Sequence, residues 1–119
     1  MKIKFAWIIV ILPLIFFSCR KGDLPTVITS EITSITMTTA VGGGNVTADG
    51  GEAVTAKGIC WSTVTGPTLF NVTSVDGQGP GEYTSYLTML TTGTKYYVRA
   101  YATNKAGTAY GNEVSFTTY

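Results

Sequence analysis

The sequence contains no histidine, and this absence excludes several kinds of active site at once. Ser-His-Asp and Cys-His systems need an imidazole as their general base. Imidazole metal sites are likewise excluded, and the two cysteines alone do not complete a structural zinc site. Most hydrolase chemistry is therefore excluded, and we predict no enzyme activity, no cofactor and no metal site.

Clustered basic residues are also lacking outside the N-terminus. Four of the 8 Lys and Arg residues lie at the start of the chain, at Lys2, Lys4, Arg20 and Lys21. The remaining four are outnumbered by the 7 acids, so the rest of the chain is slightly acidic. Binding of nucleic acid depends on clustered Lys and Arg that neutralise phosphates. We therefore expect no nucleic-acid partner.

No apolar run is long enough to span a membrane, since the longest covers only residues 5–17. Such a run forms a helix of about 20 Å, whereas the hydrocarbon core of a bilayer is about 30 Å thick and needs about 20 residues. The run follows two lysines and precedes Ser18 and Cys19, which is the organisation of a signal peptide. We interpret residues 1–18 as a cleavable signal peptide. The alternative is an uncleaved anchor in the membrane interface, which Trp7 and the flanking basic residues would suit.

The acidic residues are typical of turns. Asp49 and Asp76 each precede a glycine, and Glu82 follows one. An Asp-Gly pair favours a turn because Asp hydrogen-bonds its own backbone while Gly adopts positive φ. We interpret these acids as turn residues; the alternatives are a calcium site and a glycosidase pair.

The rest of the chain consists of short β-forming runs. From Leu24 onward, runs rich in Thr, Val, Ile and Tyr alternate with turn residues, and no helical apolar period occurs. The runs cover residues 27–30, 32–37, 40–46, 54–62, 71–75, 83–88, 96–103 and 113–118. If the first two form one interrupted strand, about seven strands predict an all-β fold, a single antiparallel β-sandwich over residues 26–119. Residues 19–25 then form a tether.

Alternation of side chains predicts which strand faces form the core. In the run 96–103, Tyr96 and Val98 share one face with two alanines, while larger polar side chains lie on the other face. The run 113–118 alternates in the same way. The predicted core residues are Trp61, Leu90, Tyr96, Val98, Val114 and Phe116.

The run 54–62 does not alternate cleanly. Strict alternation cannot place both Cys60 and Trp61 in the core. A bulge at Gly58 would bring Ile59 and Trp61 onto one face with Val54 and Ala56, because Gly inside a strand often marks a bulge. We predict that Trp61, with the larger apolar surface, is the core residue.

The second half of the chain resembles a known family. The stretch LTTGTKYYVRAYATNKAG, residues 90–107, resembles a strand corner and the strand that follows it in fibronectin type III domains. Leu90 and Tyr96 match the hydrophobic partner and the tyrosine of that corner, whose hydroxyl hydrogen-bonds to upstream backbone. Together, GGEAVTAKGICWST and YYVRAYATNKAGTAYGNEVSFTT are similar to a variant found in surface proteins of Bacteroidetes-type bacteria. The resemblance implies an immunoglobulin-like sandwich that acts as a spacer, carrier or binding module rather than an enzyme.

The junction Phe16-Phe17-Ser18-Cys19 resembles a bacterial lipobox. This resemblance implies a lipid on the Cys19 thiol, cleavage before Cys19, and anchoring by acyl chains in the cell envelope, as an outer-membrane lipoprotein facing the periplasm or the surface. The alternatives are an ordinary secretory signal with an incidental cysteine and a disulfide to Cys60. We interpret Cys60 as a small hydrophobic strand residue.

Two functions follow from these features. The first is a membrane-anchored structural spacer, or the remnant of a larger surface protein. The second is an adhesion module that binds a protein or a glycan through Tyr97, Arg99 and Tyr101. Alternation places these three side chains together on an outward face, where two aromatic rings and a guanidinium group could stack on a ligand.

Overall fold

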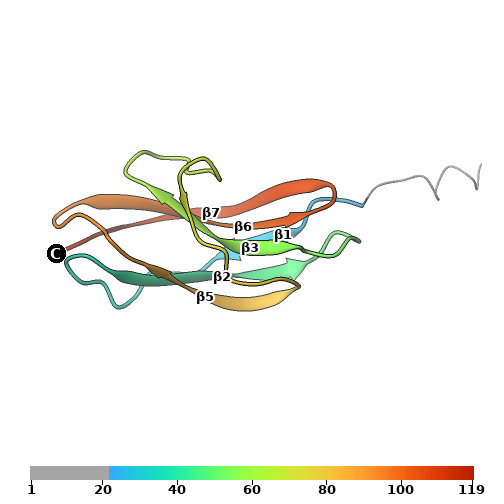
Figure 1. Ribbon diagram of the computed structural model, residues 1–119, viewed down its shortest axis with the longest axis horizontal. Helices are drawn as coiled ribbons and strands as arrows, with labels where there is room; N and C mark the ends of the chain where they lie inside the picture. The colour runs from blue at the N-terminus through green and yellow to red at the C-terminus, as the bar shows by residue number, and fades with distance from the viewer. Residues whose placement is uncertain (1–21) are drawn as a thin grey trace, which may run out of the picture.

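Short runs of Thr, Val, Ile and Tyr form the strands, because branched and aromatic side chains pack well on a pleated surface. The structure, a computed structural model, describes residues 22–119. The predicted signal peptide, residues 1–18, and the predicted lipid site at Cys19 lie outside the described residues. The strands are β1 (Thr26–Thr29), β2 (Ala40–Ala48), β3 (Ala56–Ser62), β4 (Val72–Thr73), β5 (Gly81–Leu87), β6 (Lys95–Asn104) and β7 (Gly107–Thr117) (Figure 1). Between residues 22 and 119 there is no helix, and therefore none that could cross a membrane.

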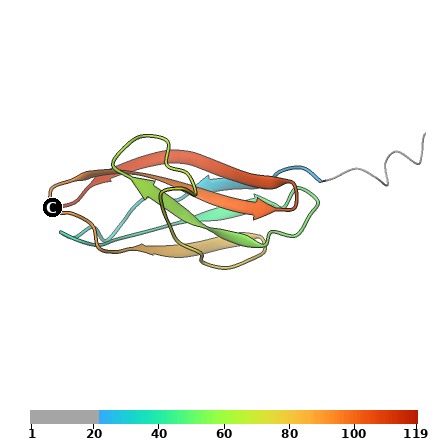
Figure 2. The ribbon, with the colours of Figure 1, turned by 45° about the horizontal axis from the view of Figure 1, so that its top comes forward.

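These strands form two antiparallel sheets packed face to face. Sheet A contains β1, β2 and β5, in that order, and sheet B contains β4, β3, β6 and β7. Figure 2 shows the two layers and the loops that connect them. The predicted antiparallel sandwich of seven strands is confirmed.

Hydrophobic side chains from both sheets fill the space between the layers. The predicted core residues that are buried there are Trp61, Leu90, Tyr96, Val98 and Phe116. Val114 is half-buried and packs against the same cluster. The rings of Tyr96 and Phe116 stack with centroids 5.7 Å apart, so β6 and β7 contribute neighbouring aromatic rings to one end of the core.

The strand β3 has no bulge at Gly58, so that prediction is wrong. Its register with β6 runs without a shift from Ala56, opposite Thr103, to Ser62, opposite Tyr97. Strict alternation therefore holds, and Lys57 shares the inner face with Ile59 and Trp61. The Lys57 side chain is buried, and its Nζ donates a hydrogen bond of 3.1 Å to the carbonyl oxygen of Pro80.

The outer face of β3 is covered, which alternation alone does not reveal. Residues 63–80, which we call the crossing segment, connect β3 of sheet B to β5 of sheet A (Figure 1). The segment includes the short edge strand β4. Cys60 is fully buried beneath this segment although it points away from the core between the sheets. A Cβ at Gly58 would lie 2.2 Å from the carbonyl oxygen of Ser74, so only glycine allows the segment to approach here.

Three of the predicted strands differ by more than two residues in length or are missing, whereas the others match to within two residues at each end. Residues 32–37 form no strand, only an isolated bridge between Thr33 and Val41. The run 71–75 is reduced to the two residues of β4. The last strand, β7, begins at Gly107 rather than at residue 113, because a tight turn after Asn104 continues the β6 ladder directly into β7.

The folded body begins before residue 26. Asp23 donates a backbone hydrogen bond of 2.8 Å to Gly50, and its carbonyl oxygen accepts one of 2.7 Å from the Asn104 side chain. Pro25 is buried. Residues 23–25, expected to belong to the tether, are therefore held against the sandwich.

Candidate functional site

The structure corrects the predicted ligand face of Tyr97, Arg99 and Tyr101. Tyr101 is only 2% exposed, so the prediction that it lies outward and accessible is wrong. Its hydroxyl donates a hydrogen bond of 2.6 Å to the carbonyl oxygen of Ser74 in the crossing segment. Burial raises the pKa of this hydroxyl, with a further contribution from the Asp76 carboxylate, so the group stays protonated as a donor.

Arg99 is held by the same segment. Its Nε and Nη2 donate hydrogen bonds of 2.9 and 2.7 Å to the carbonyl oxygen of Pro67, and its guanidinium lies 4.3 Å from the ring centroid of Tyr110. The Tyr110 hydroxyl in turn accepts a hydrogen bond of 3.1 Å from the backbone of Leu69. The guanidinium expected to contact a ligand therefore fastens the crossing segment to sheet B.

Tyr97 is the one member of the predicted face without a hydrogen bond to the crossing segment. Its side chain is half-buried, and the Nζ of Lys95 lies 5.4 Å from its ring centroid. Alternation correctly indicates that these side chains point away from the core, but not that another part of the chain covers two of them. The three residues do not form an accessible binding face.

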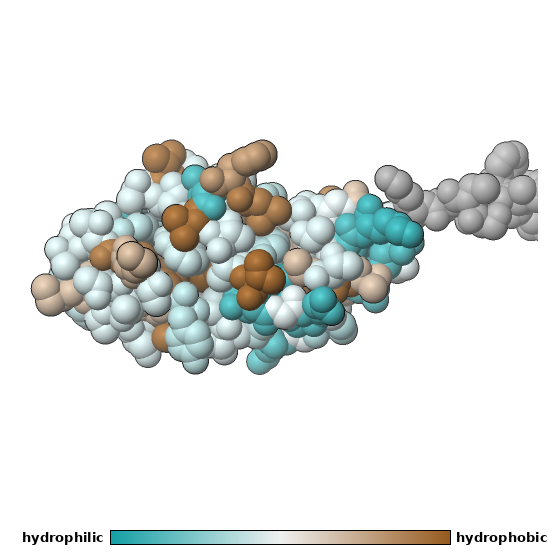
Figure 3. Space-filling view, viewed as in Figure 1, coloured by the Kyte–Doolittle hydropathy of each residue, from teal (hydrophilic) through white to brown (hydrophobic). Residues whose placement is uncertain are grey.

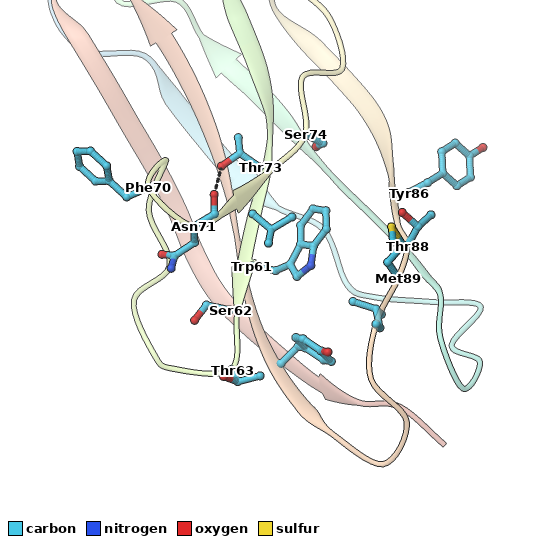
Figure 4. A pocket seen from close by; sticks show the side chains of 13 residues that line it. Trp61, Ser62, Thr63, Phe70, Asn71, Thr73, Ser74, Tyr86, Thr88 and Met89 are labelled. Carbon is cyan, nitrogen blue, oxygen red and sulfur yellow. Dashed lines mark hydrogen bonds between the residues drawn. The ribbon is translucent and has the colours of Figure 1, made fainter.

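An open groove lies instead where the two sheets diverge (Figure 4). One wall comes from β3 and from the crossing segment with its strand β4, and the other from the end of β5 and the residues after it. The 13 residues that line it are Trp61, Ser62, Thr63, Phe70, Asn71, Val72, Thr73, Ser74, Tyr86, Thr88, Met89, Leu90 and Tyr96. None of them is acidic or basic, so the groove suits an uncharged, partly apolar surface.

Trp61 brings a polar group to this groove. The residue is 6% exposed, and no acceptor within the described residues completes a hydrogen bond with its indole N–H. Figure 4 shows the ring between the two walls of the groove. A donor that lines an open groove can be paired by water or by an acceptor of a bound molecule.

A short turn beside the groove displays an apolar ring. Phe70 is 100% exposed, although backbone and side-chain hydrogen bonds define the turn that carries it. Asn71 donates a backbone hydrogen bond of 2.9 Å to Thr68, and its side-chain oxygen accepts one of 2.8 Å from the Thr68 backbone. In Figure 4 the Phe70 ring stands on the outer side of the β4 wall, away from Trp61. The exposure is therefore built into an ordered turn.

A buried polar cluster closes the side of the sandwich next to the groove. The Asp76 carboxylate accepts hydrogen bonds from the hydroxyls of Ser74 and Ser85, and Ser85 is fully buried. The Tyr83 hydroxyl donates a hydrogen bond of 2.7 Å to the carbonyl oxygen of Gly58, across the two sheets. Burial first, and the nearby Asp76 second, raise the pKa of Tyr83 far above its usual value. The cluster joins the crossing segment to both sheets.

No group of acidic, Cys or His side chains among residues 22–119 is arranged to hold a metal ion. Cys60 is buried, and its burial raises the pKa of the thiol to about 11, so the thiol is protonated at neutral pH. Its Sγ donates to the carbonyl oxygen of Arg99 at 3.5 Å. Cys60 therefore acts as a packed strand residue in this structure.

Comparison with known proteins places the fold. No protein-family model matches the sequence, and no curated protein matches it either. Among solved structures, the chain is similar to a structure described as a myokine, with a TM-score of 0.58 and 20% identity over 82% of this chain and 98% of the other. It is also similar to the sixth fibronectin type III domain of human fibronectin type III domain containing protein 3, with a TM-score of 0.54 and 23% identity over 82% of each chain.

The chain has a fibronectin type III-like fold. A bacterial example is the sensor domain of the anti-sigma factor RsgI4 from Pseudobacteroides cellulosolvens, with a TM-score of 0.59 and 16% identity over 81% of this chain and 95% of the other. The hydrogen bond of 2.8 Å from the Thr91 backbone to the Tyr96 hydroxyl agrees with the corner that the resemblance implies.

The groove contains residues that sequence reasoning did not group together. Trp61, Leu90 and Tyr96 are predicted as core, while Phe70 and Met89 are not singled out. One signal is present in the sequence: residues 62–75 contain no charged residue but several apolar ones, in a stretch that connects strands. An apolar, uncharged connection is unusual for a solvent-exposed segment, which indicates either burial or contact with a partner.

Proposed function

We propose that the chain is a non-catalytic fibronectin type III-like module of a bacterial cell envelope, held at the outer membrane by a lipid on Cys19, and that it acts as a structural spacer. The observation that carries the proposal is the small number of residues along the chain between the predicted lipid site and the folded body. Only Arg20, Lys21 and Gly22 separate Cys19 from Asp23, whose backbone is hydrogen-bonded to Gly50 at 2.8 Å. A lipid on Cys19 would therefore hold one end of the sandwich next to the bilayer.

The arrangement of the sandwich supports a spacer. The described chain enters at one end of the long axis and Tyr119 lies at the opposite end (Figure 1). An anchor at the entry end would orient the body away from the membrane. The similar structures include fibronectin type III domains, which are typically non-enzymatic, and the lack of histidine supports the same interpretation.

The test is the intact mass of the full chain extracted from membranes of a bacterial host with a lipoprotein pathway. We expect a wild-type mass that begins at Cys19 and includes the added lipid, and sedimentation with outer membranes. The Cys19→Ala variant should lose the lipid, whereas Cys60→Ala, the matched cysteine control, should retain it. A wild-type protein recovered soluble and without lipid would refute the anchor.

The alternative function, adhesion through Tyr97, Arg99 and Tyr101, receives no support from these side chains. Tyr101 is buried and Arg99 is hydrogen-bonded to Pro67. Tyr97→Ala should therefore leave any glycan or protein binding by the full chain unchanged on an array. A binding signal that this substitution abolishes would restore the adhesion hypothesis for this face.

A further inference from the structure

We propose that the free side of β5 is a docking site for an extended segment of another protein, which adds to sheet A as a fourth strand. We call the outward backbone groups of Glu82, Thr84 and Tyr86 the open edge. The inference rests on hydrogen-bond direction, on exposure and on charge, and it does not depend on a lipid at Cys19.

The hydrogen bonds of β2 show which backbone groups of β5 are open. Val41 exchanges two backbone hydrogen bonds with Thr33, of 2.8 and 2.9 Å, and the Gly43 carbonyl oxygen accepts one of 3.0 Å from the Ser30 backbone. Backbone groups alternate in direction along a strand. The odd-numbered residues of β2 therefore face the β1 side of the sheet, and its even-numbered residues face β5.

The open edge lies opposite the odd-numbered residues of β2. Glu82, Thr84 and Tyr86 pair with positions 45, 43 and 41. Their N–H and C=O groups therefore point away from β2, and no other hydrogen bond among residues 22–119 uses them. These groups form the row of donors and acceptors with which a further strand pairs.

The strand β5 lacks the features that block strand addition. Natural edges are blocked by proline, lysine, bulges or very short strands. The sequence of β5, GEYTSYL, contains no proline and no lysine, and its register with β2 runs from Gly81 to Leu87 without a shift. Sheet B, by contrast, ends beside the groove in the two residues of β4. Sheet A is therefore the sheet that can accept a strand at this margin.

Sheet A is also narrower than sheet B, with three strands against four. Val72 of β4 pairs with Trp61 of β3, so both side chains lie on the inner face of sheet B. Trp61 is 6% exposed but Val72 is 58% exposed, because sheet A ends at β5 and has no strand opposite β4. Figure 3 shows hydrophobic side chains gathered over the loop between β3 and β5. A strand added at the open edge would continue sheet A towards β4 and cover Val72.

The surroundings of the open edge specify the side chains of the added strand. Its inner side chains would face the groove, where none of the 13 lining residues is charged, so alternate residues should be apolar. Its outer side chains would lie beside the exposed side chains of the open-edge residues. Glu82 and Glu31 line one hollow on this outer face, so a lysine or arginine fits there. The occupant is therefore an extended peptide segment with alternating apolar residues and a basic residue on its outer face.

Amide hydrogen exchange of the full chain tests the proposal. The probe is the synthetic peptide LTVTVKV, acetylated and amidated, whose antiparallel addition would place its lysine beside Glu82. We expect the amides of Glu82, Thr84 and Tyr86 to exchange several-fold more slowly in its presence, since they would donate to its carbonyl oxygens. The amides of Tyr83 and Ser85, already paired with β2, are the internal control and should not change. Unchanged exchange at the open edge in excess peptide would overturn the proposal.

N-methylation of the peptide separates backbone pairing from side-chain contact. Methyl groups on the threonines and the lysine remove the N–H groups that would face β5, so this peptide should give no protection. Methyl groups on the valines would point away from β5 and should leave the protection in place. Equal protection by both peptides would overturn strand addition, and this comparison requires no variant of the protein.

Thr84→Pro closes the edge from the side of the protein. Proline removes one open N–H and no hydrogen bond to β2, so the variant should fold but lose the response to the peptide. The matched control is Thr84→Val, which keeps the N–H and should keep the response. Protection that persists in a folded Thr84→Pro protein would contradict the proposal. Open-edge amides that are already protected without peptide, in proportion to protein concentration, would identify a second copy as the occupant and overturn a foreign segment.

Glu82→Lys tests the charge of the occupant. We expect this variant to prefer LTVTVEV, in which glutamate replaces the lysine, whereas the wild-type chain should prefer LTVTVKV. The same preference in both proteins would overturn the basic residue as part of the occupant.

Discussion

Arg99 donates two hydrogen bonds, of 2.9 and 2.7 Å, to the single carbonyl oxygen of Pro67, 32 positions earlier in the chain. This pair fixes the crossing segment on the outer face of sheet B. The segment contains the turn with Phe70 and one wall of the groove. Together with the Tyr101–Ser74 hydrogen bond, these two hydrogen bonds therefore help to fix the position of the candidate site.

Arg99→Met should loosen the crossing segment. We expect a loss of about 1–2 kcal/mol in the free energy of unfolding, since a hydrogen bond to a charged donor is lost and the Pro67 carbonyl is left unpaired. Urea unfolding measures the loss, and limited proteolysis should show faster cleavage within residues 63–75. Lys105→Met removes an exposed cation from the β6–β7 turn and should change stability by less than about 0.5 kcal/mol. Equal effects of the two substitutions would contradict this role of Arg99.

Asp76→Asn should destabilise the protein. Both the Ser74 and Ser85 hydroxyls donate to one carboxylate oxygen, Oδ2, and an amide oxygen there could still accept both hydrogen bonds, but without the negative charge that strengthens them; the amide nitrogen would also bring two donors into a cluster of donors. We expect a cost of about 1–3 kcal/mol because Ser85 is fully buried. The control is Asp49→Asn, in which the amide oxygen can still accept the hydrogen bond of 2.8 Å from the Gly51 backbone. Thermal unfolding should show a lower melting temperature for the first variant alone.

Tyr96→Phe should be costly, whereas Tyr97→Phe should be nearly neutral. The Tyr96 hydroxyl accepts the Thr91 backbone hydrogen bond at 2.8 Å, while the Tyr97 hydroxyl has no hydrogen bond among the described residues. Loss of the acceptor leaves a partly buried N–H unpaired, which costs about 1–3 kcal/mol. Urea unfolding of the two variants side by side makes the comparison. Similar stabilities would show that the corner hydrogen bond contributes little.

Stability should fall in alkaline solution through Cys60. Burial raises the pKa of its thiol from 9.0 to about 11 in the folded protein. The unfolded chain therefore releases this proton first, so the stabilisation is complete below pH 9 and is lost as the pH rises to about 11. Cys60→Ala should reduce the slope of unfolding free energy between pH 9 and 10, below the ordinary tyrosine pKa of 10.0. The same slope in both proteins would contradict the assignment.

The extent to which the fold follows from the sequence can be argued from β6. Its alternation is local, so Tyr96 and Val98 are correctly predicted as core residues. Tyr101 has the same period but is buried on the opposite face, because the crossing segment covers that face. Alternation tells which side of a sheet faces the other sheet. It does not tell where a distant connection lies.

The same limit applies to β3 and to the candidate site. Cys60 and Trp61 are both buried without any bulge, since β3 is covered on both faces. The uncharged stretch 62–75 is visible in the sequence, but the groove that brings Trp61 opposite Met89 is not. A groove depends on how segments distant in the sequence pack together, which local patterns do not reveal.

The two-residue strand β4 has a consequence for aggregation. An exposed edge strand is a template on which strands of other molecules can add, and long apolar edges lead to fibres. At the margin of sheet B beside the groove, only Val72 and Thr73 offer backbone for such pairing. The protein therefore presents apolar side chains at this margin without offering a long ladder for amyloid-like growth.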